Sequence, residues 1–171
     1  MRDWVLIMAR EQQPVGDAAA TADWAVIYYA GHGIEVNGTN YLLPVDAKLQ
    51  KAAHIADEAL PLDRLVSKVE ASKKLRLVIL DACRNNPFSA RMQRDGRTRS
   101  VGRGLARIEP VGGTLIAYAA RDGTEAADGD GRHSPYAEAL MQHLDEPGLD
   151  IRFLFDATFD EAQRIERLLA A

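Results

Sequence analysis

Three short apolar runs stand out along the chain: residues 24–30 (WAVIYYA), 75–82 (LRLVILDA) and 113–120 (GTLIAYAA). Each has the length of a β-strand and is apolar on both faces rather than alternating, which is typical of strands buried within a parallel sheet. The intervals between the runs are long enough for the crossover connections that parallel strands need. The pattern therefore predicts an α/β fold built on a mainly parallel sheet.

A helix is expected between the first two runs, where apolar residues recur with helical spacing. They occupy one face of a helix opened by Pro61, at Leu62, Leu65, Val66 and Val69. Before this helix, residues 34–43 (IEVNGTNYLL) predict a hairpin that turns at Asn37 and Gly38, a pair suited to a type I′ turn.

Two further helices are expected after the third run. Ser134 and Pro135 form a typical N-cap and first position for a helix over 136–144. Asp150 can cap another helix over 151–171. One side of that helix is lined by Ile151, Leu154, Phe155, Thr158, Ala162, Ile165 and Leu169.

Length, charge and apolar content narrow the class of protein. A chain of 171 residues fits one domain, which we expect over 1–171 with a core at 22–161 and loops at 87–104 and 121–133. The formal net charge of −4 provides no overall attraction to nucleic acid or to anionic membranes. No run approaches the roughly 20 apolar residues of a membrane span, and the N-terminus does not resemble a signal peptide. We therefore expect a cytoplasmic protein without nucleic-acid or membrane partners.

The chemistry-bearing residues His32 and Cys83 follow the first two apolar runs. If these strands are parallel neighbours, both residues lie at the carboxyl edge of the sheet, where ligands bind in open α/β folds. A thiolate is a reactive nucleophile, and a nearby imidazole can take the thiol proton and later protonate the leaving amine. Gly33 leaves room for its N–H, with that of Cys83, to stabilise an oxyanion.

Each of these residues also has an ordinary structural interpretation. Cys83 is the only cysteine of the chain, which excludes an internal disulfide and a thiolate-rich metal site. A lone cysteine after a strand is often a small buried hydrophobe, and a histidine between glycines is often a loop residue. The pair by itself leaves the structural and the catalytic interpretation open.

The motifs YYAGHG (28–33) and DAC (81–83) resemble those of the caspase and metacaspase cysteine peptidases, especially their bacterial caspase-like branch. Cys83 stands 51 residues after His32, and a histidine about 50 residues before the cysteine is the arrangement known for caspases. The resemblance covers about residues 22–161, and includes the segments GTNYLLPVDA, LVILDACRNNPF and DGDGRHSPYAEAL. It implies a three-layer α/β/α sandwich and a protein or peptide substrate.

The resemblance also implies roles for individual residues. Cys83 would be the nucleophile, His32 the general acid and base, and Gly33 with Cys83 the oxyanion hole. In metacaspase-like members, an aspartate two places before the cysteine binds arginine or lysine at the cleaved position, together with a carboxylate after the next strand. Here these are Asp81 and Asp122. No cofactor is required, although calcium is an option because some metacaspases need it.

The resemblance weakens at both ends of the chain. We find no clear counterpart of the first family strand before Trp24, since residues 4–8 read equally well as strand or helix, and we expect the last strand to be absent too. A sheet without a central strand leaves edge groups unpaired, which favours self-association. The alternative to a peptidase is therefore a catalytically inactive caspase-like module that binds a partner.

Overall fold

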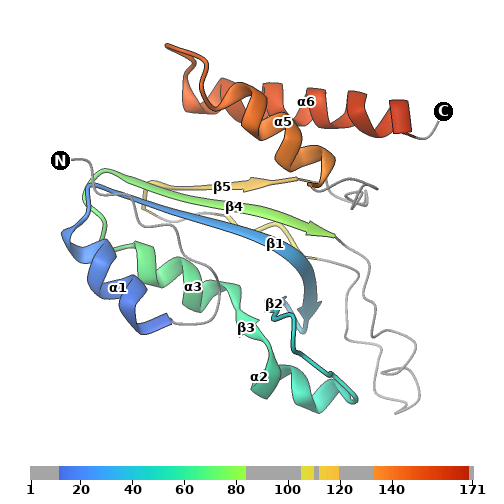
Figure 1. The fold of residues 1–171 in the computed structure, drawn as a ribbon. Coiled ribbons are helices and arrows are strands. Elements are labelled where there is room, and N and C mark those ends of the chain that lie inside the picture. Colours follow the sequence, from blue (N-terminus) through green and yellow to red (C-terminus); the bar gives the residue numbers. More distant parts are fainter. Residues whose placement is uncertain (1–11, 84–104, 110–111, 120–132, 170–171) are drawn as a thin grey trace.

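The computed structural model describes residues 12–83, 105–109, 112–119 and 133–169. Its five-stranded sheet has the order β3-β2-β1-β4-β5. The strands are β1 (Trp24–Val36), β2 (Thr39–Leu43), β3 (Leu60–Pro61), β4 (Leu75–Cys83) and β5 (Thr114–Tyr118). β1, β4 and β5 run parallel, as Figure 1 shows, whereas β2 is antiparallel to β1 and to β3. The three apolar runs thus form the parallel core that the sequence predicted.

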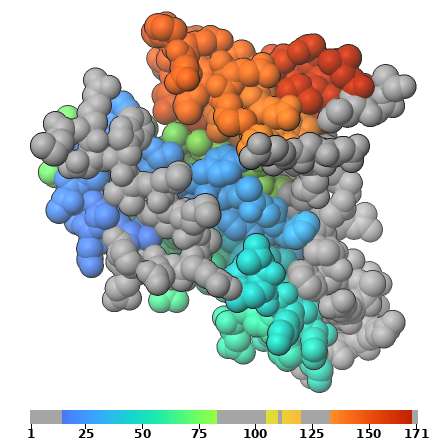
Figure 2. Space-filling view, in the orientation of Figure 1, coloured from blue at the N-terminus to red at the C-terminus, as the bar shows by residue number. Residues whose placement is uncertain are grey.

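Helices cover both faces of the sheet, which gives the expected three layers (Figure 1). Helices α1 (Gln12–Thr21) and α3 (Leu62–Val69) lie on one face, and α5 (Pro135–His143) and α6 (Ile151–Leu169) lie on the other. A short 3₁₀ turn, η1 (Ala52–His54), and α2 (Ile55–Glu58) follow β2. In the space-filling view the α5–α6 layer and the β2–α2 segment lie at opposite ends of the molecule (Figure 2).

The local signals for helices and turns are confirmed. Ser134 caps α5, since its hydroxyl accepts a hydrogen bond from Ala137 N, and Asp150 accepts one from Arg152 N at the start of α6. Asn37 and Gly38 both have positive φ, 52° and 81°, as a type I′ turn requires. The expected inner face of α6 is buried at Leu154, Thr158 and Ala162.

Two predictions concern residues that the structure does not describe. The segment 4–8, which the sequence left open between strand and helix, lies outside them, as do most of the expected loops at 87–104 and 121–133. Within the described part of the chain, no helix combines the length and the apolar character needed to cross a membrane.

The first strand is longer than the predicted run and curves toward its carboxyl end (Figure 1). Its first part pairs with β4 and its last part pairs with β2, so that His32 has a register partner on each side. The sequence predicted an apolar strand at residues 24–30 and left open whether His32, just beyond it, is a loop residue or a catalytic one. The strand continues through His32 to Val36, because antiparallel pairing with β2 begins where parallel pairing with β4 ends.

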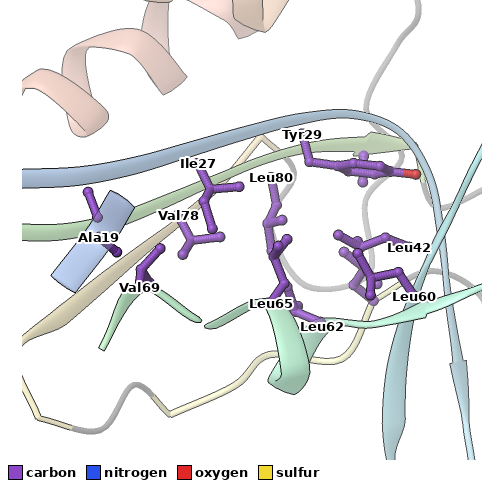
Figure 3. Close-up of a cluster of buried hydrophobic side chains, with 13 residues drawn as sticks. Ala19, Ile27, Tyr29, Leu42, Leu60, Leu62, Leu65, Val69, Val78 and Leu80 are labelled. Carbon is purple, nitrogen blue, oxygen red and sulfur yellow. The ribbon is translucent and has the colours of Figure 1, made fainter. Parts of the chain in front are cut away.

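The buried side chain of Tyr29 fills the inside of this bend (Figure 3). Its hydroxyl lies 2.7 Å from His32 O and 2.9 Å from Leu43 O, and accepts a hydrogen bond from Leu43 N at 3.0 Å. Burial raises the pKa of Tyr29 to about 12, which keeps the hydroxyl neutral and able to donate. A Cβ at Gly31, where φ is 155°, would lie 2.8 Å from this oxygen. Tyr29 and Gly31 together shape the bend that carries His32.

Replacing Tyr29 by Phe should destabilise the fold by about 1–3 kcal/mol, because it strands buried backbone groups of His32 and Leu43. Tyr136→Phe is the matched control, since the buried Tyr136 hydroxyl has no hydrogen-bond partner in the segments that the structure describes. Chemical denaturation of both variants gives the two free energies of unfolding. Equal losses for the two variants would contradict this role of Tyr29.

Gly33 is required by packing against a distant segment. The buried side chain of Leu105 lies directly over it, and a Cβ at Gly33 would come within 2.5 Å of Leu105 Cγ. Leu105 belongs to the core cluster between the sheet and the α1–α3 layer. The absence of a side chain at position 33 therefore lets Leu105 pack against β1.

Gly33→Ala should cost about 1–3 kcal/mol of stability through overpacking, and Leu105→Ala about 2–5 kcal/mol through a cavity. The double variant should lose less than the sum, because the smaller residue at 105 makes room for the new methyl group. Denaturation of the wild type, both single variants and the double variant measures the coupling free energy. Additive losses would show that the two residues do not compete for the same space.

Candidate active site

His32 and Cys83 are register partners across the parallel strands β1 and β4, at the carboxyl edge of the sheet. Cys83 is the last residue of β4, and its side chain lies outside the described part of the structure. Pairing of the two backbones brings the two positions side by side, as the sequence predicted. That the His32 imidazole and the Cys83 thiol lie within reach of each other remains a prediction.

The imidazole of His32 is incompletely satisfied by the protein. The residue is partly exposed, yet its Nδ1 atom is buried and has no hydrogen-bond partner within the described part of the chain. Leaving a buried polar atom unpaired costs about 1–3 kcal/mol, so that such atoms are rare in folded proteins. The hydrogen bond from the Tyr29 hydroxyl to the His32 carbonyl fixes the backbone that carries the ring.

Asp81, two residues before Cys83, is buried with 7% of its surface exposed. Its Oδ2 atom accepts hydrogen bonds from the Tyr28 hydroxyl at 2.7 Å and from the Ser134 hydroxyl at 2.5 Å. Tyr28 comes from the neighbouring strand β1, and Ser134 is the N-cap of α5. The carboxylate therefore joins the sheet to the α5–α6 layer next to the His32–Cys83 pair.

The charge of Asp81 contributes to a raised pKa in two tyrosines on this side of the sheet. Burial, together with the hydrogen bond to Asp81, raises the pKa of Tyr28 above its ordinary value. Burial and then the charge of Asp81 also raise the pKa of Tyr136, whose buried hydroxyl no described residue pairs with. Both hydroxyls thus stay protonated around a carboxylate.

Of the two other predicted site residues, one is described by the structure and one is not. Gly33 directly follows His32 and pairs with Leu42 of β2, and the packing of Leu105 is one reason for a glycine there. Asp122, the second expected substrate carboxylate, lies outside the described residues. Among the described residues, no group of three His, Cys, Asp or Glu side chains could hold a metal ion, and calcium binding stays a prediction.

Sequence reasoning missed the hydroxyl groups around Asp81. Ser134 was identified only as a helix cap, and Tyr28 only as a residue of a buried strand. A signal was present, because a tyrosine within a buried apolar run carries a hydroxyl that needs a partner. The identity of that partner depends on the register between β1 and β4 and on where α5 begins.

Comparison with protein families agrees with this arrangement. The family model described as Caspase domain matches residues 8–163, which is most of the chain. No curated protein matches the chain. The match includes both strands of the His32–Cys83 pair, the Asp81 cluster, helix α5 and α6 as far as residue 163. The chain therefore belongs to the caspase-domain family of cysteine peptidases.

Proposed function

We propose that this chain is a cysteine endopeptidase that acts through a dyad of Cys83 and His32. The observation that carries the proposal is the backbone register, which sets the two residues opposite each other at the edge where α/β sheets bind ligands. The caspase domain implies a protein substrate. The unpaired Nδ1 atom of His32 adds support, because a dyad needs an imidazole nitrogen that the protein itself does not occupy.

In the proposed reaction, His32 accepts the proton of the Cys83 thiol, and the thiolate attacks the carbonyl carbon of the scissile peptide bond. The carbonyl oxygen becomes an oxyanion, for which the N–H groups of Gly33 and Cys83 are the proposed donors. His32 then gives its proton to the leaving amine. Water, deprotonated by the same imidazole, hydrolyses the resulting thioester and restores the free thiol.

The proposed substrate preference is for arginine or lysine before the scissile bond. Asp81 supports it, because this buried carboxylate adjoins the nucleophile position and accepts hydrogen bonds only from neutral hydroxyls among the described residues. A carboxylate in such a place favours a cationic ligand, which supplies the opposite charge. Asp122 is proposed as the second carboxylate of the same pocket.

Cys83→Ala and His32→Ala should each abolish cleavage of a fluorogenic arginine-ended peptide, since the nucleophile and its base act as one unit. His54→Ala is the matched control, because His54 lies at η1, outside the edge that carries the dyad, and pairs with Glu58. Assays run on folded protein with and without calcium. A folded wild-type protein without thiol-dependent cleavage would favour the inactive, partner-binding module instead.

Asp81→Asn should lower kcat/KM for arginine-ended and lysine-ended peptides by about 10- to 100-fold, as expected for the loss of a charge-assisted contact. Asp23→Asn is the control, because Asp23 is exposed and pairs with Lys74 at the opposite end of β1. Peptide cleavage and thermal unfolding are measured on both variants. Faster cleavage of aspartate-ended than arginine-ended peptides by the wild type would refute the roles given to Asp81 and Asp122.

A further inference from the structure

The hydrogen bonds to Asp81 have a feature that the proposed function does not require. Both donors, Tyr28 and Ser134, converge on the same oxygen, Oδ2, although they come from different elements. Ser134 donates its single proton to Asp81 while its oxygen accepts from Ala137 N at 3.0 Å. Its hydroxyl is thus held in one orientation by the start of α5, and the carboxylate is fixed by two elements at once.

This arrangement leaves the two carboxylate oxygens unequal. An oxygen of an ionised carboxylate has about two lone-pair sites, and Oδ2 of Asp81 uses both for hydroxyl donors. Among the residues that the structure describes, none donates a hydrogen bond to Oδ1. A cation that approaches Asp81 is therefore offered one oxygen, Oδ1, instead of a pair.

A second observation concerns Tyr136, which packs on the same face of the sheet as Tyr28. Among the described residues, the Tyr136 hydroxyl has no hydrogen-bond partner, although Tyr136 is only 3% exposed and the Asp81 charge contributes to its raised pKa. Buried hydroxyls normally find a partner, and an unpaired one is a group that a ligand can satisfy. Tyr136 packs with Tyr28 in the core cluster between the sheet and the α5–α6 layer, the layer from which Ser134 donates to Asp81.

Arginine and lysine differ in how they use a carboxylate. A guanidinium gains most when two parallel N–H groups meet two oxygens, whereas an ammonium is a compact charge that needs only one. A carboxylate that offers a single oxygen removes the advantage of the guanidinium. The donors on Oδ2 therefore decide whether Asp81 distinguishes between the two cations.

We propose that Tyr28 and Ser134 are specificity-determining positioning residues, which hold Asp81 as a one-oxygen acceptor so that the pocket takes lysine as well as arginine. The inference rests on the proposed function, because it assigns the ligand of Asp81 to the residue before the scissile bond. Neither residue touches the reacting atoms, and both act through the carboxylate.

The test compares kcat/KM for two peptides that differ only in arginine or lysine before the cleaved bond. Tyr28→Phe should change lysine cleavage little, because the ammonium still meets Oδ1. Arginine cleavage should rise several-fold, because a lone pair freed on Oδ2 permits a bidentate contact. The arginine-to-lysine ratio should therefore rise several-fold.

Two further variants separate selectivity from stability. Ser134→Ala should raise the same ratio, while it also lowers the melting temperature through loss of the α5 cap. Ser134→Thr keeps a hydroxyl that can cap and donate, and should retain the wild-type ratio. Tyr118→Phe is the matched control on the other face of the sheet, where the Tyr118 hydroxyl accepts a hydrogen bond from Ile108 N. An unchanged ratio in both Tyr28→Phe and Ser134→Ala would overturn the proposal.

A binding measurement distinguishes failure of this inference from failure of the peptidase activity. Calorimetry with the Cys83→Ala protein uses peptide amides that end in arginine or lysine. Similar affinities for the two, and a shift toward arginine when Tyr28→Phe is added, would support the inference even if the wild type cleaves neither peptide. Binding of neither amide, or no shift between them, would overturn it.

Discussion

The parallel pairing of β1 with β4 determines the positions of the candidate dyad. It runs from Trp24 opposite Leu75 to His32 opposite Cys83 without interruption. A slip of one residue would turn every side chain of β1 to the other face of the sheet. Ile27 and Tyr29 would leave the cluster under α1 and α3, and Val26 and Tyr28 would leave the opposite cluster. Burial of these apolar side chains on both faces thus also fixes the residue that faces Cys83.

At the carboxyl edge, β1 has to leave β4 without losing its partners. Antiparallel pairing with β2 takes over at His32, and Tyr29 binds backbone groups of both strands inside the bend. Glycine at positions 31 and 33 follows from this geometry, because the Tyr29 hydroxyl and the Leu105 side chain occupy the space that side chains there would need. The motif that resembled a flexible loop is a strand held on both sides, which is a better support for a group that must transfer a proton.

The predictable parts of the structure are those whose signals are local. Apolar runs, an Asn-Gly turn and a Ser-Pro cap each depend on a few neighbouring residues, and all formed as expected. Helix α1 was not predicted, since Pro14 and Gly16 are poor helix formers, although proline is tolerated in a first turn. The position of His32 within a strand and the donors of Asp81 were missed for another reason. They depend on contacts between segments about 50 residues apart, such as Tyr28 with Asp81, which periodicity does not contain.

The Asp81 cluster shows why a structural and a functional interpretation of one residue need not compete. A strand-end carboxylate that only satisfied neighbouring donors would be an ordinary feature, and Asp81 does anchor α5 through Ser134. The same hydrogen bonds hold the carboxylate in one orientation beside the nucleophile position. A ligand that binds there does not have to order the Asp81 side chain, so that conformational entropy is not lost on binding. Because the cap of α5 and the proposed pocket share one hydroxyl, movement at the start of this helix would be transmitted directly to Asp81. The helix layer is therefore part of the proposed site rather than only a cover for the sheet.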